Sequence, residues 1–153
     1  MIQEFLREVE LFRALDDEEL AEVLMAGRVR RFPAEARVLS EGSPGGQLMV
    51  VHQGQVRVSK QLPGFGEEAL AVLGPGEFVG EVSFLDGGPI SADVIAHRDC
   101  ELWVVPHAEV EALMLRDPGL AAKFLWAFAR TLATRLRQTD ARLASLVSLA
   151  SRR

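Results

Sequence analysis

The segment from Phe78 to Val94, FVGEVSFLDGGPISADV, determines how the rest of the chain is interpreted. It begins with an apolar, strand-like end that runs into the GE pair at positions 80–81, and the DGGP run at 86–89 forces a bend before a strand restarts at Ser91. Glycine lets backbone N–H groups approach a ligand, and a short helix N-terminus directs several of them at one charge. The segment is predicted to hold an anion; the simpler alternative is a plain connection between two strands.

Five positions of this segment are candidate ligand contacts. Glu81 is placed to accept hydrogen bonds from a sugar diol, or else it caps the short helix that follows. The backbone amides of Gly80, Val82 and Ser83 are predicted to face an anion, helped by the dipole at the helix end. Ser91 offers a hydroxyl donor, or else it simply starts a strand.

Short apolar segments and turn signals alternate on both sides of this segment, between Arg28 and Val105. This spacing predicts an antiparallel sandwich or jelly roll. The run Leu48–Val51 is apolar throughout and is expected to be central, whereas alternation in Gln55–Gln61 predicts one solvent-facing side that carries Arg57 and Ser59. The expected strands are Val29–Phe32, Arg37–Ser40, Leu48–His52, Gln55–Gln61, Ala69–Leu73, Ser91–Ala96 and Leu102–Val105.

Helices are expected at both ends of the chain. Positions 1–27 are predicted to be helical, and Asp16 with Glu19 three residues later is typical of a helix start. One apolar face is formed by Ile2, Phe5, Leu6, Val9 and Phe12. A short helix is predicted over 106–115. Asp117-Pro118 then begins a long one, because Asp is a good N-cap and Pro is favoured at the first helical position.

The long C-terminal helix is predicted to run without a breaker to Arg153, roughly 30 residues or about 45 Å. A stripe of mostly apolar residues runs along this helix. It continues beyond the part that a small barrel can contact, which predicts a coiled coil between two copies of the chain. The alternative is a helix folded back on its own barrel. The stripe comprises Leu125, Phe128, Leu132, Arg135, Thr139, Leu143 (or Arg142), Leu146 and Ala150.

Composition narrows the classes of protein that are compatible with the sequence. The chain has 153 residues and a net charge of −5, which suits one globular domain with an extra element and argues against DNA binding. No apolar run reaches the ~20 residues of a membrane span, so a cytoplasmic protein is expected. The single cysteine, Cys100, is expected to be a buried strand residue, and His107 an exposed first-turn residue. No metal site and no catalytic constellation is recognised, so the protein is expected not to be an enzyme.

The order of these signals resembles the cyclic nucleotide-binding domain of the catabolite activator family and of protein kinase A regulatory subunits, from Phe5 to at least Leu146. The motifs that carry the resemblance are LFRALDDEEL (11–20), EGSPGG (41–46), LMVVHQGQVRVSK (48–60) and LGPGEFVGEVSFL (73–85). It implies an α+β fold, with an antiparallel β jelly-roll barrel and N-terminal helices over residues 1–116 and a long dimerisation helix over 117–153.

The resemblance also assigns roles to residues of the Phe78–Val94 segment, which matches the family's phosphate-binding cassette at Gly80, Glu81, Ser91 and Ala92. In the family the Glu binds the ribose 2′-hydroxyl and an Arg pairs with the cyclic phosphate, but the arginine position is Ile90 here. Arg57 and Arg98 are the candidate substitutes. Thr139 matches a helix Thr that contacts the purine in the family.

Three functions follow as hypotheses from this resemblance. The first is a stand-alone homodimeric sensor that binds cAMP or cGMP weakly. The second is a degenerate module closed by Ile90, which acts on an unknown protein partner and binds no nucleotide. The third is an accessory regulator whose long helix docks on another protein. No helix-turn-helix follows the long helix in this sequence, so specific DNA binding is not expected.

Overall fold

The structure is a computed structural model that describes residues 2–152; Met1 and Arg153, which the expected domain boundaries include, lie outside the described residues. The helices are α1 Ile2–Arg7, α2 Asp17–Ala26, α3 Glu81–Asp86, α4 His107–Arg116 and α5 Pro118–Ala150. The strands are β1 Arg28–Phe32, β2 Arg37–Leu39, β3 Gln47–Gln53, β4 Val56–Leu62, β5 Gly66–Leu73, β6 Phe78–Val79, β7 Asp93–Ala96 and β8 Cys100–Pro106.

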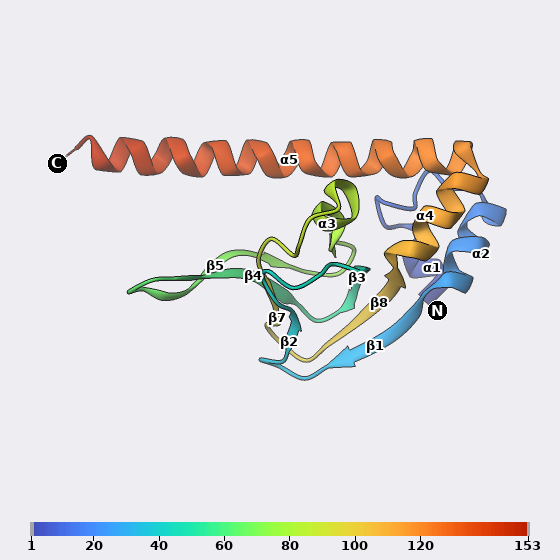
Figure 1. The fold of residues 1–153 in the computed structure, drawn as a ribbon, viewed down its shortest axis with the longest axis horizontal. Helices are drawn as coiled ribbons and strands as arrows, with labels where there is room; N and C mark the ends of the chain where they lie inside the picture. The colour runs from blue at the N-terminus through green and yellow to red at the C-terminus, as the bar shows by residue number, and fades with distance from the viewer. Residues whose placement is uncertain (1, 153) are drawn as a thin grey trace.

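Two four-stranded antiparallel sheets form the jelly roll, in the orders β1-β8-β3-β6 and β2-β7-β4-β5. The long helix α5 lies across one side of the barrel, and the short helix α3 lies between the barrel and α5 (Figure 1). The expected α+β jelly roll with helices at both ends is confirmed.

Strand β3 is central because it is buried on both faces. Leu48 and Val50 belong to a core cluster shared with α2, α4 and α5, whereas Met49 and Val51 belong to the barrel interior. Burial on both faces accounts for the uninterrupted apolar run, since a half-exposed strand alternates apolar and polar residues. The expectation that 48–51 is central is confirmed.

Two details of the expected barrel are wrong. Ser59 was expected on a solvent-facing side of β4 but is fully buried; the pairing of β4 with β5 shifts register between Val58 and Ser59, which interrupts the regular alternation of the strand. The strand expected from Ser91 begins two residues later, at Asp93, so Ser91 lies in the loop before it.

The N-terminal helical region is interrupted, contrary to the expectation of helix throughout 1–27. Helix α1 ends at Arg7, and turns follow until Asp16 caps α2. Val9 and Leu11 are both buried, and a regular helix would direct residues two apart to nearly opposite sides. The turns therefore allow both to enter the core. The Asp16–Glu19 capping box is confirmed, with both reciprocal hydrogen bonds present.

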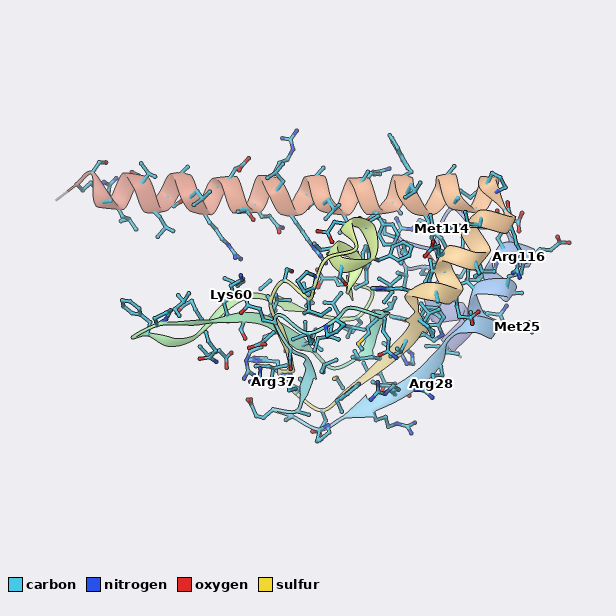
Figure 2. All side chains as sticks on the ribbon, viewed as in Figure 1. Met25, Arg28, Arg37, Lys60, Met114 and Arg116 are labelled. Atoms are coloured by element: carbon cyan, nitrogen blue, oxygen red, sulfur yellow. The ribbon has the colours of Figure 1, made fainter. Side chains whose placement is uncertain are left out.

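Helix α5 starts as the sequence predicts, because Asp117 accepts a hydrogen bond from the Leu120 amide and Pro118 follows at the first helical position. The helix is 33 residues long and extends past the barrel toward the C-terminus (Figure 1). Side chains project from it both toward the barrel and away from it (Figure 2). Within the described part of α5, the buried residues are Leu120, Phe124, Ala127 and Phe128.

Candidate functional site

The site is built around the start of α3, where Gly80 has a left-handed backbone with φ of 95°. A Cβ at this position would lie 2.3 Å from the Gln47 carbonyl oxygen, so only glycine fits without moving β3. The tight approach fixes the start of α3 against the barrel. The first-turn N–H groups of α3 have no partner within the helix.

A cavity of about 110 Å³ lies beside α3, and we call it the cassette cavity. Six of the seven residues predicted to bind ligand line it, and the seventh, Thr139, does not. Ile90 also lines it and is only 5% exposed, so an apolar side chain occupies the position where the resemblance implies an arginine. The lining residues are Leu39, Val58, Val79, Gly80, Glu81, Val82, Ser83, Ile90, Ser91, Ala92, Val94 and Arg135.

Glu81 is buried and forms an ion pair with Arg135 of α5. Arg135 also donates a hydrogen bond of 2.7 Å to the Phe78 carbonyl oxygen, and its guanidinium lies 5.6 Å from the centroid of the Phe78 ring. Burial lowers the pKa of Arg135, and the Glu77 carboxylate opposes that shift. Because a buried carboxylate without a cation is strongly disfavoured, Arg135 stabilises the charged form of Glu81.

The two arginines considered as substitutes for the cassette cation do not line the cassette cavity. Arg57 binds Glu67 at 2.6 Å and Glu35 at 2.7 Å, and these two carboxylates raise its pKa. Arg98 is exposed, in the turn between β7 and β8. The cation beside the predicted site residues is instead Arg135.

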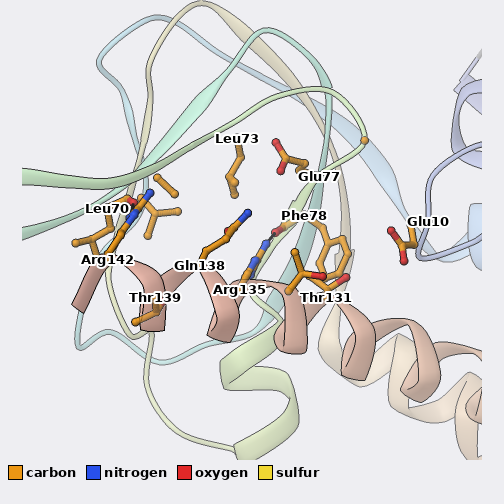
Figure 3. Close-up of a pocket in the computed structure, with 14 residues that line it drawn as sticks. Glu10, Leu70, Leu73, Glu77, Phe78, Thr131, Arg135, Gln138, Thr139 and Arg142 are labelled. Atoms are coloured by element: carbon orange, nitrogen blue, oxygen red, sulfur yellow. Dashed lines mark hydrogen bonds between the residues drawn. The ribbon is translucent and has the colours of Figure 1, made fainter. Parts of the chain in front are cut away.

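A second and larger cavity, of about 330 Å³, lies between α5 and the β4–β5 side of the barrel, and we call it the helix cavity. Thr139 lines this cavity, and Arg135 and Val58 line both cavities. Figure 3 shows Arg135 and Gln138 extending from α5 toward Leu73 and Glu77 of the barrel wall. Arg135 therefore lies at the boundary between the two cavities.

His107, predicted to be an exposed residue, is half-buried instead and supports the cassette. Its Nε2 lies 3.1 Å from the Gly80 carbonyl oxygen and its ring packs 5.2 Å from that of Phe84. Because the carbonyl can only accept, Nε2 carries the proton. Burial lowers the pKa of His107, which favours the neutral ring. Cys100 is buried on β8, as expected.

Arg135 is the residue of the cassette cavity that the sequence analysis placed wrongly. It was assigned, with Phe128, to a seam between two chains, but Phe128 is 1% exposed in this chain's own core and Arg135 pairs with Glu81. The signal was present: Phe124, Phe128, Thr131 and Arg135 follow one 3,4 spacing, so the face that starts as core continues into Arg135.

No group of three or more His, Cys, Asp or Glu side chains within residues 2–152 is placed to hold a metal ion. None of the helices in the same range combines the length and apolarity that crossing a bilayer demands.

Comparisons with a family model and with known proteins both relate this chain to cyclic nucleotide-binding proteins. The family model described as cyclic nucleotide-binding domain matches residues 29–117. The cyclic AMP receptor protein of Thermus thermophilus is 37% identical over 133 residues, which cover 87% of this chain and 60% of that protein. The chain thus spans about 60% of that relative's length.

Solved structures show the same architecture. A cyclic nucleotide-binding domain from Methylobacillus flagellatus superposes with a TM-score of 0.81 and 29% identity, over 92% of this chain and 79% of that one. The catabolite activator protein of Thermus thermophilus gives a TM-score of 0.75 and 36% identity, over 90% of this chain and 62% of that one.

Proposed function

This chain belongs to the cyclic nucleotide-binding domain family, and from that premise we propose that it is a cytoplasmic, non-enzymatic sensor that binds cAMP or cGMP weakly. The observation that carries the proposal is the buried Glu81 beside the Gly80 turn, with Val82, Ser83, Ser91 and Ala92 on the same cavity. These groups offer a carboxylate for a ribose hydroxyl and amides for an anion.

The two cavities together suit a nucleotide better than either one alone. The cassette cavity, at about 110 Å³, is smaller than the roughly 300 Å³ at which small-molecule sites begin. The helix cavity is about 330 Å³ and has an apolar wall that includes Leu70, Ala71 and Leu73. We propose that ribose and phosphate occupy the cassette cavity and that the base lies in the helix cavity near Thr139.

Thermal unfolding with added nucleotide tests this function. A ligand at 100 times its dissociation constant is expected to stabilise the protein by about 2.7 kcal/mol. The dissociation constant is expected to be micromolar or weaker, because Ile90 cannot pair with a phosphate, so the titration must reach millimolar cAMP and cGMP. Glu81→Gln is the control, since it keeps the size of the side chain and weakens the contact to the ribose hydroxyl. A wild-type melting curve unchanged by either nucleotide would contradict the proposal.

A second candidate function is a ligand-free interaction module, and the size of the cassette cavity favours it. Ile90 and Val94 are both buried on the wall of this small space. If no nucleotide enters, the domain acts through its surface on a protein partner.

We also propose that the protein is a homodimer through α5. Beyond Phe128, several large apolar side chains of α5 are exposed: Leu136, Leu143, Leu146, Val147 and Leu149. A helix that leaves such residues uncovered is expected to pair with a second helix, as in a two-stranded coiled coil. Leu136 and Leu143 are seven residues apart and so lie on one stripe of the helix.

Replacing both Leu136 and Leu143 by Glu is expected to convert the dimer to a monomer, because each change places a charge in an apolar seam. Sedimentation velocity at micromolar protein concentration measures the result. Ala141→Glu is the matched control, since Ala141 is exposed and lies on nearly the opposite side of the helix from Leu143. A wild-type protein that sediments as a monomer would exclude this dimer.

A further inference from the structure

The cassette cavity has one cationic side chain among its described lining residues, and it comes from the long helix. Arg135 lines this cavity together with Glu81, Ser91 and Ile90. A cyclic phosphate that enters the cavity must be neutralised there, because transfer of a charge from water into a partly buried site is costly. Ile90 provides no charge.

The geometry of Arg135 suits an anion. Its side chain is 33% exposed and lines both cavities, whereas the Glu81 side chain that pairs with it is buried. The contacts to Glu81 and to the Phe78 carbonyl leave further guanidinium N–H groups available, and a planar guanidinium binds phosphate oxygens in pairs. The guanidinium lies on the boundary where the cassette cavity meets the helix cavity.

We propose that Arg135 is the phosphate ligand of this domain and replaces the missing cassette arginine. The inference rests on the proposed function. In the free protein Arg135 pairs with Glu81; on binding, the phosphate takes up Arg135 and a ribose hydroxyl donates to Glu81. The contact to the phosphate thus comes from α5 and not from the cassette, so occupancy of the site acts directly on the long helix.

Calorimetry with cAMP and adenosine tests the proposal, because adenosine keeps the ribose 2′-hydroxyl and lacks the phosphate. Arg135→Gln is expected to weaken cAMP binding by at least about tenfold and to change adenosine binding by less than about threefold. Arg135→Lys keeps the charge without the fork and is expected to recover part of the loss. Arg137→Gln is the control, since Arg137 is an exposed arginine on the same helix.

Arg135→Gln leaves the Glu81 carboxylate buried without its cation and can unfold the protein. The same comparison is therefore made in a Glu81→Gln background, where no carboxylate remains: the double variant is expected to bind cAMP at least about tenfold more weakly than Glu81→Gln alone. In the wild type, the Arg135 Nε resonance is expected to shift more with cAMP than with adenosine, because both bring a ribose hydroxyl to Glu81 and only cAMP brings a phosphate to Arg135.

The outcomes separate this inference from the proposed function. Unchanged cAMP affinity in the Arg135 variants, or equal losses for cAMP and adenosine, would overturn the inference while leaving nucleotide binding intact. If the wild type binds none of cAMP, cGMP and adenosine, the proposed function is wrong, and so is the proposed role of Arg135.

Discussion

Phe128→Ala is expected to lower the free energy of unfolding by about 3–5 kcal/mol, the range found for truncating a buried phenylalanine. Phe128 is 1% exposed and packs against three aromatic rings. The centroids of Phe78 and Phe84 each lie 5.8 Å from its own, and that of Phe124 lies 6.3 Å away. It therefore joins α5 to β6 and to α3 at once. Since folded domains are stable by only about 5–15 kcal/mol, this single change is large.

Urea unfolding followed by circular dichroism measures the effect, at one protein concentration because an associating chain gains stability with concentration. Phe65→Ala is the matched control: it removes the same side chain from the β4–β5 turn, where Phe65 is 82% exposed, and is expected to cost less than about 0.5 kcal/mol. A loss below about 1 kcal/mol for Phe128→Ala would mean that α5 does not rest on the barrel in solution.

The local signals in the sequence were sufficient for most of the fold. Asp16 with Glu19 and Asp117 with Pro118 mark helix starts, because each places a side-chain acceptor before free backbone amides. The apolar run 48–51 predicted the central strand, and β3 is buried on both faces. These signals depend on residues within one turn or one strand of each other, and tertiary contacts did not override them.

Features that depend on contacts across the fold were not predictable from spacing. Arg57, expected to face solvent, instead pairs with Glu35 and Glu67, which come from different segments of the chain. Likewise, the cassette residues were identified from the segment itself, but the partner of Glu81 lies on α5. A long helix with apolar residues on two faces permits two assignments of the inward face. The 3,4 spacing of Phe124, Phe128 and Arg135 is compatible with one of them, and the burial of Phe124 and Phe128 shows that this face is the inward one.

The arginine position of the cassette offers the most direct test of why binding is expected to be weak. The backbone of Ile90 is held on both sides, since its amide donates to the Ser43 carbonyl at 2.9 Å and its carbonyl accepts from the Gly42 amide at 2.9 Å. Its side chain lines the cassette cavity. A longer side chain at position 90 is therefore expected to point into the cassette cavity.

Ile90→Arg is expected to tighten cAMP binding by about 10- to 100-fold, because a bidentate contact between arginine and phosphate contributes roughly 1.5–3 kcal/mol. Without ligand, the variant places a second guanidinium near Arg135, with Glu81 as the nearby counter-charge, so it is expected to be less stable than the wild type. Calorimetry gives the affinities. Ile90→Met is the control, since it nearly conserves volume without adding charge and is expected to change the affinity by less than about threefold.

The double variant Ile90→Arg with Arg135→Gln links this prediction to the role of Arg135. If Arg135 carries the phosphate in the wild type, a new arginine at position 90 supplies the same contact, so removing Arg135 is expected to cost less affinity in the Ile90→Arg background than in the wild type. Residues that share one partner are non-additive in this way. Equal losses in both backgrounds would show that the two arginines act on different groups. Nanomolar binding of cAMP by the wild type would contradict the expected weak binding, because Ile90 in place of arginine would then not have lowered the affinity.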